Sequence, residues 1–184
     1  NQSAAPGLLE GLKKLEYRGY DSAGIAVMKD GTIAVSKVTG RIAGLEEKTQ
    51  NGALLPGTTG IGHTRWATHG APTEPNAHPH TSNDGRFAVV HNGIIENYLE
   101  LRQELMAKGY RFESETDTEV VVHLVEMYYR GDLMKAVMQT SARLRGSYAL
   151  GIICTDKPDT MIAVREASPL ILGVGIGENF FASD

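Results

Sequence analysis

Apolar and polar positions along the 184-residue chain follow two different periods. Leucines at helical spacing over 8–15, with charged residues between them, predict a first helix, and Pro6 suits its first turn. Thr116 is the expected N-cap of a later helix that begins at Asp117. Four further segments are predicted to be helical: 42–50, 97–109, 117–129 and 133–144.

Short apolar runs bounded by turn residues predict strands at 24–28, 32–38, 59–64, 87–91, 148–155, 161–164, 170–174 and 180–181. The dipeptide Asp30-Gly31 between the first two runs indicates a tight hairpin. Residues 65–86 lack periodicity and contain several prolines, which is typical of a long loop that carries function. Strands at both ends with helices between them predict a layered α+β domain with mostly antiparallel sheets.

The composition is that of one globular domain, with 41% hydrophobic and 22% charged residues. The net charge of −4 and the lack of a basic tract argue against a nucleic-acid partner, and no apolar run approaches the roughly 20 residues of a membrane span. A single cysteine and no visible signal peptide predict a cytoplasmic protein. Because the first residue is Asn1, we expect the natural start to lie further upstream.

The densest polar cluster, residues 63–70, lies where a predicted strand opens into the long loop. Arg65 offers a planar fork of donors that suits a carboxylate or phosphate, although a solvated surface pair would explain it as well. After the next strand, the Asn92 amide and the Gly93 backbone N–H could form an oxyanion hole. The alternative is that Asn92-Gly93 is simply a turn.

A run of acidic and threonine residues, 115–119, leads into a predicted helix. Its carboxylates are explained by the helix dipole, but Asp117 could instead bind an ammonium group. Taken together, a carboxylate-binding Arg65, an ammonium-binding Asp117 and an oxyanion hole describe acyl transfer on an amino-acid substrate. No serine, cysteine or threonine stands out as the nucleophile beside a base.

Five of the six histidines fall within residues 63–91, which raises the question of a metal site. No carboxylate or cysteine completes a recognised ligand spacing, so we predict no metal and no cofactor. Cys154 ends an apolar run and is expected to be a core residue rather than a reactive thiol.

Five segments in order resemble the glutaminase domains, or type 2 glutamine amidotransferase domains, of glucosamine-6-phosphate synthases. They are LEYRGYDSAG at 15–24, GHTRWATHG at 62–70, NAHPH at 76–80, VHNGIIEN at 90–97 and SETDTE at 114–119. The resemblance extends over nearly the whole chain. It implies the N-terminal-nucleophile hydrolase fold, a four-layer αββα sandwich with two mostly antiparallel sheets.

The resemblance also implies roles for particular residues. Arg65 would bind the α-carboxylate of L-glutamine and Asp117 its α-ammonium group, while Asn92 and Gly93 would stabilise the oxyanion. The remaining matches would line or close the pocket, and Arg18 would be structural. These pocket positions are Trp66, Thr68, His69 and His78.

In this family the nucleophile is a cysteine at the mature N-terminus, on a short strand ahead of the first helix. We therefore expect residues 1–184 to be a glutaminase domain that lacks this strand and is inactive alone. The expected product besides L-glutamate is ammonia, which passes to a C-terminal sugar isomerase domain in a homodimeric parent protein. The alternatives are a purine-type or asparagine-type amidotransferase, or an inactive binding module.

Overall fold

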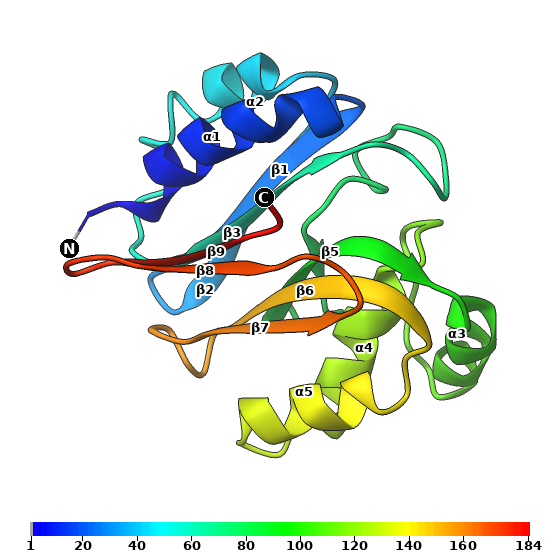
Figure 1. Cartoon of the computed structure of the whole chain (residues 1–184). Helices are drawn as coiled ribbons and strands as arrows, with labels where there is room; N and C mark the ends of the chain where they lie inside the picture. The colour runs from blue at the N-terminus through cyan, green and yellow to red at the C-terminus, as the bar shows by residue number, and fades with distance from the viewer. Residues whose placement is uncertain (1) are drawn as a thin grey trace.

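The computed structural model describes residues 2–184 and contains two antiparallel sheets enclosed by helices (Figure 1). The first sheet has the order β2-β1-β3, with bounds Thr32–Thr39, Ser22–Lys29 and Gly60–Arg65. The second has the order β4-β5-β6-β7, with bounds His80–Thr81, Phe87–Ile95, Gly146–Cys154 and Met161–Glu166. A separate hairpin joins β8 (Ile171–Val174) to β9 (Asn179–Ala182).

Helices cover the outer face of each sheet, as Figure 1 shows. Helices α1 (Ala4–Leu15) and α2 (Ile42–Lys48) lie against the first sheet. Helices α3 (Tyr98–Ala107), α4 (Glu119–Tyr128) and α5 (Leu133–Ser141) lie on the side of the second sheet. The order of layers is helix, sheet, sheet, helix, as predicted. Within residues 2–184, no helix combines the length and the apolar character needed to cross a membrane.

Strand alternation divides the core into three apolar layers, because successive side chains point to opposite faces of a sheet. In β1, Ile25 and Val27 pack under α1 and α2, while Ala26 and Met28 face the other sheet. In β5, Phe87 and Val89 pack among the helices on the far side, and Ala88 meets the first sheet. The middle layer combines two alanines with larger side chains such as Met28, Ile61 and Ile153.

The hairpin between β1 and β2 forms as predicted. Asp30 and Gly31 both have positive φ, 50° and 75°. A two-residue hairpin with a type I′ turn requires positive φ at both of its central residues. Cys154 is fully buried in the layer between the second sheet and its helices, so the prediction of a core cysteine is confirmed.

Three local predictions were wrong. The strand predicted to end at His91 continues to Ile95, so Asn92-Gly93 lies inside β5 and is not a turn. Helix α4 begins at Glu119, with Thr118 at the N-cap position in place of Thr116. The predicted loop 65–86 contains the short strand β4, which pairs with β5.

Candidate active site

A polar pocket opens where the end of β3, the middle of β5 and the segment before α4 converge. Its volume is about 90 Å³, well below the range typical of drug-sized ligands, and this suits a small metabolite. All eight predicted site residues line it: Arg65, Trp66, Thr68, His69, His78, Asn92, Gly93 and Asp117. The structure thus brings together residues up to 52 positions apart in the sequence, while their individual roles stay predictions.

Arg65 is the last residue of β3 and is only 4% exposed. Its guanidinium donates to the backbone carbonyls of residues 69 and 70 through Nη2 and of residue 71 through Nη1. Burial lowers the pKa of Arg65, and the nearby carboxylates of Asp21 and Asp117 oppose that shift. Three of the five N–H donors are engaged, so two remain for a carboxylate ligand.

Asp117 provides the negative charge of the pocket and is also 4% exposed. Its Oδ2 accepts a hydrogen bond of 2.8 Å from the backbone N–H of Ile95 in β5. Within residues 2–184 the hydrogen bonds of this side chain involve Oδ2, which leaves Oδ1 for a ligand. An amino acid carries both charges on one carbon, so Arg65 and Asp117 together suit its α-carboxylate and α-ammonium groups.

Gly93 has φ of +121° inside β5, a conformation that only glycine adopts without strain. A β-carbon at this position would clash with the carbonyl oxygen of Ser147 on β6. The backbone conformation and the packing against β6 therefore require glycine at this position.

The amide of Asn92 is oriented by a histidine that the sequence analysis did not assign to the site. His63 Nε2 lies 2.8 Å from Asn92 Oδ1. Burial lowers the pKa of His63 to about 4, although its hydrogen bond to Asn92 opposes the shift. His63 is thus neutral at pH 7. With Asn92 Oδ1 assigned as the acceptor, the proton of His63 is on Nε2. This turns the NH₂ group of Asn92 away from His63.

The buried histidines form a stack rather than a metal centre. The rings of His63 and His78 are 4.1 Å apart and nearly parallel, and His78 Nδ1 accepts from the backbone N–H of His91. Burial lowers the pKa values of His78 and His91 below the ordinary range. Among the described residues, no group of three or more potential ligand side chains could hold a metal ion.

Four residues of the pocket lining were missed by the sequence analysis: His63, His91, Thr116 and Thr118. Each lies one or two positions from a predicted residue, within a motif already identified. The concentration of histidines between residues 63 and 91 is the sequence signal that points to His63 and His91. His91 Nδ1 is 2.8 Å from Thr118 Oγ1, so the histidine connects β5 to the residue that precedes α4.

Trp66 and the pair Thr68 and His69 form the rim of the pocket. Trp66 is 58% exposed and packs edge-on against Tyr20, with ring centroids 5.5 Å apart. His69 Nδ1 lies 3.3 Å from Thr68 Oγ1, and the His69 ring packs edge-on against Tyr98. These contacts connect the residues of the rim to Tyr20 and Tyr98.

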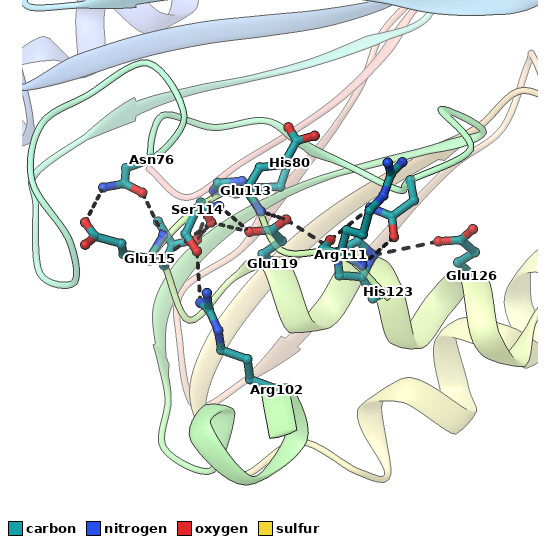
Figure 2. Close-up of polar contacts among 12 residues, drawn as sticks. Asn76, His80, Arg102, Arg111, Glu113, Ser114, Glu115, Glu119, His123 and Glu126 are labelled. Carbon is teal, nitrogen blue, oxygen red and sulfur yellow. Dashed lines mark hydrogen bonds and ion pairs between the residues drawn. The ribbon is translucent and has the colours of Figure 1, made fainter. Parts of the chain in front are cut away.

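A buried carboxylate holds the segment that carries Asp117 (Figure 2). Glu119 accepts hydrogen bonds from the backbone N–H groups of Glu113 and Ser114, at 2.9 and 2.7 Å, and from Ser114 Oγ at 2.6 Å. His123 Nε2 is 3.4 Å from the same carboxylate. Burial raises the pKa of Glu119, but these hydrogen bonds, led by that of His123, outweigh it and lower the pKa overall.

Glu119→Gln is expected to lower the free energy of unfolding by about 2–3 kcal/mol at pH 7, because an NH₂ group would face backbone donors. A carboxyl with a lowered folded pKa stabilises above its unfolded value of about 4.5 and loses that contribution as pH falls. The difference between wild type and variant should therefore shrink by about 1 kcal/mol at pH 4. Denaturant titrations at both pH values test this, and a pH-independent difference would contradict it.

The αββα sandwich, with a small charged pocket lined by the end of β3, the middle of β5 and the segment before α4, has the architecture of the N-terminal-nucleophile hydrolase class. Two solved structures share the fold, with TM-scores of 0.82 and 0.81 at 28% and 30% identity. They are the glutamine phosphoribosylpyrophosphate amidotransferase from B. subtilis complexed with ADP and GMP, and an allosteric regulatory enzyme of purine biosynthesis. Each match covers 98% of this chain and 39% of the other. The predicted fold is thereby confirmed.

Residues 63–184, about two thirds of the chain, match the model of the glutamine amidotransferase domain, and the chain belongs to that family. Two curated relatives are named glutamine–fructose-6-phosphate aminotransferase [isomerizing]. The protein from Clostridium tetani is 56% identical over 183 residues, covering 100% of this chain and 30% of the relative. That from Clostridium perfringens is 59% identical over 177 residues, covering 96% and 29%. The chain thus spans about 30% of the length of these relatives.

Proposed function

We propose that this chain is the glutaminase domain of a glutamine–fructose-6-phosphate aminotransferase. It would hydrolyse L-glutamine to L-glutamate and ammonia. The ammonia would pass to a C-terminal sugar isomerase domain of the same homodimeric, cytoplasmic protein, where fructose 6-phosphate becomes glucosamine 6-phosphate. The observation that carries the proposal is one pocket with Arg65 and Asp117 as opposite charges beside the amide of Asn92.

The proposed reaction begins when the pocket binds the two charged groups of glutamine, an interaction that we call the amino-acid grip. Arg65 and Asp117 would bind the α-carboxylate and α-ammonium groups, which leaves the side-chain amide of glutamine to extend toward Asn92 and Gly93. A cysteine thiolate ahead of Asn1 would attack the amide carbon, and the resulting oxyanion would accept hydrogen bonds from the Asn92 NH₂ and the Gly93 N–H. The C–N bond would then break, ammonia would leave with a proton supplied by the cysteine amine, and water would hydrolyse the thioester.

Cys154 does not fit the role of nucleophile. It lies on β6 within the core cluster that faces the helices, it is fully buried, and it is not part of the pocket lining. Burial raises the pKa of its thiol, which disfavours the reactive thiolate. We therefore expect a polypeptide of residues 1–184 alone to hydrolyse no glutamine, and one extended at its N-terminus by a strand that begins with cysteine to do so.

The proposal predicts that the full-length protein forms glucosamine 6-phosphate from fructose 6-phosphate when glutamine is the nitrogen donor. Glutamate and the amino sugar phosphate would appear in equal amounts, measured by chromatography of the reaction mixture. Phosphoribosyl pyrophosphate serves as the competing acceptor, because the structural neighbours include an amidotransferase named for it. Amine transfer to that acceptor, or no glutamine hydrolysis by full-length protein, would contradict the proposal.

A further inference from the structure

Asn76 is a buried polar residue of the long loop that does not line the pocket. It lies between β3 and β4 and is 2% exposed. Burying an amide costs free energy unless its donors and acceptor are satisfied. The side chain of Asn76 is satisfied by two segments that are far apart in the sequence, and Figure 2 shows the contacts that it makes with Glu115.

The partners of Asn76 fix the orientation of its amide. Nδ2 donates to the carbonyl of Ala71 at 2.9 Å and to Glu115 Oε2 at 3.1 Å. Oδ1 accepts from the backbone N–H of Glu115 at 2.8 Å. Rotating the amide by 180° would place Oδ1 against two acceptors, so one orientation is enforced.

These three hydrogen bonds connect the two halves of the proposed amino-acid grip. The Ala71 carbonyl that accepts from Asn76 also accepts from Arg65 Nη1 at 3.1 Å. On the other side, Glu115 precedes Asp117 by two residues, and Asp117 is itself tied to β5 through Ile95. Asn76 thus shares a hydrogen-bond acceptor with Arg65, the proposed carboxylate-binding arm. It also binds Glu115, which lies two residues before Asp117, the proposed ammonium-binding arm.

Gly70 provides a second observation on the same bridge. Its φ is +80°, and a β-carbon there would lie 2.6 Å from Asn76 Nδ2 and 3.0 Å from Glu115 Cβ. The carbonyl of Gly70 also accepts from Arg65 Nη2 at 3.3 Å. The loop therefore packs against the amide so tightly that only glycine fits, and the position of Arg65 depends on that packing.

We propose that Asn76 is a positioning residue that sets the spacing between Arg65 and Asp117, and thereby selects substrates with both an α-carboxylate and an α-ammonium group. The inference rests on the proposed glutaminase function. Asn76 itself touches neither the substrate nor the oxyanion donors. Its loss therefore weakens the two-point grip while leaving the reacting amide and its surroundings intact.

The effect should appear in KM rather than in kcat. Removing the amide leaves the Ala71 carbonyl and the Glu115 N–H without a partner, and each arm can then move independently. Small misplacements of positioning groups cost up to about 10²-fold in reactions that depend on orientation. For Asn76→Ala we expect the KM for glutamine to rise about ten- to hundredfold, with kcat within about threefold of wild type.

Asn83 offers a matched control. Its Nδ2 donates to the carbonyl of Arg111 at 2.9 Å and its Oδ1 accepts from the N–H of Arg111 at 2.8 Å. It thus anchors the same segment, four residues before Glu115, but it has no contact with the loop 69–71 among the described hydrogen bonds. Asn83→Ala should leave the KM for glutamine unchanged, even where it lowers thermal stability.

The decisive experiment measures glutaminase kinetics of the full-length protein with three substrates: glutamine, glutaramate (which lacks the α-ammonium group) and 4-aminobutanamide (which lacks the α-carboxylate). Asn76→Ala should raise KM for glutamine and leave KM for either analogue within about threefold, because neither uses both arms. Equal increases for all three substrates, or the same increase in Asn83→Ala, would overturn the proposal.

Two further variants keep the test decisive. Asn76→Asp preserves the shape but removes the Nδ2 donor and opposes the Glu115 carboxylate, so it should reproduce the KM effect if Asn76→Ala fails to fold. Gly70→Ala should raise KM for glutamine in the same way, by displacing the amide.

Arg65→Ala distinguishes a failure of the proposed function from a failure of the role of Asn76. If Arg65→Ala leaves KM unchanged, the proposed function fails. If Arg65→Ala raises KM but Asn76→Asp does not, only the role of Asn76 is refuted.

Discussion

Asn92→Ala is expected to lower kcat for glutamine hydrolysis by about 10²–10³-fold, the usual cost of removing one donor from an oxyanion hole. The amide lies in the pocket, and its oxygen is held by His63 at 2.8 Å, so the NH₂ group is oriented before the substrate binds. KM for glutamine should change little, because the donor acts on charge that develops only in the transition state. Steady-state kinetics of full-length protein measure both constants.

Asn97→Ala is the control for this substitution. Asn97 also uses both ends of its amide, donating to the carbonyl of Arg143 and accepting from the N–H of Arg145, but it is not part of the pocket lining. Its loss should lower stability without the large fall in kcat. If Asn92→Ala kept a kcat within tenfold of wild type while remaining folded, the assignment of Asn92 to the oxyanion hole would be wrong.

Arg65→Ala is expected to raise KM for glutamine by roughly 10²-fold, equivalent to about 3 kcal/mol of lost binding. Hydrogen bonds between a guanidinium and a carboxylate are charge-assisted and strong, and the buried setting of Arg65 limits screening by water. Part of the loss would arise in the loop 69–71, whose carbonyls accept from the same side chain. The measurement is glutamine binding or KM in full-length protein.

Arg65→Lys separates charge from geometry. Lysine keeps the positive charge but cannot supply the planar fork that binds a carboxylate and the loop carbonyls at once. It should therefore fall between wild type and Arg65→Ala. Equal KM values for wild type and Arg65→Ala would remove the carboxylate assignment, whatever the behaviour of the lysine variant.

Arg65 and Asn92 line the same pocket, but their substitutions are expected to change different kinetic constants: KM for Arg65→Ala and kcat for Asn92→Ala. Arg65 interacts with groups of glutamine that do not change during the reaction, so its loss appears in the ground state. Asn92 interacts with the atom whose charge changes. A full-length protein that bound glutamine with an affinity dependent on Arg65 but hydrolysed none of it would instead behave as an inactive binding module.

Local sequence patterns predicted the helices and strands well where one period dominated. The leucines of α1 and the apolar runs of β1 and β6 were placed within a few residues of their observed bounds. The pattern failed at Asn92-Gly93, since this dipeptide favours turns when only neighbouring residues are considered. In the structure β6 pairs with this stretch, Gly93 opposite Tyr148, and the strand continues.

The start of α4 shows the same limit. Thr116 looked like an N-cap because it precedes an acidic and apolar run, but its hydroxyl is 3.1 Å from His80 Nε2 and 3.0 Å from Ser114 Oγ. Tertiary contacts with the long loop and with Glu119 hold 113–117 outside the helix. Asp117 in this segment lines the pocket.

The sequence by itself determined the layered α+β class, the family resemblance and eight of the residues that meet in the pocket, because these follow from periodicity and from motifs in a fixed order. Only the tertiary structure decided how those residues are held. His63 against Asn92, Asn76 between Arg65 and Asp117, and Glu119 beneath the Asp117 segment are contacts between segments 29 to 39 residues apart, or across a buried turn. Such contacts depend on which strands pair and which faces are buried, and no local pattern records that.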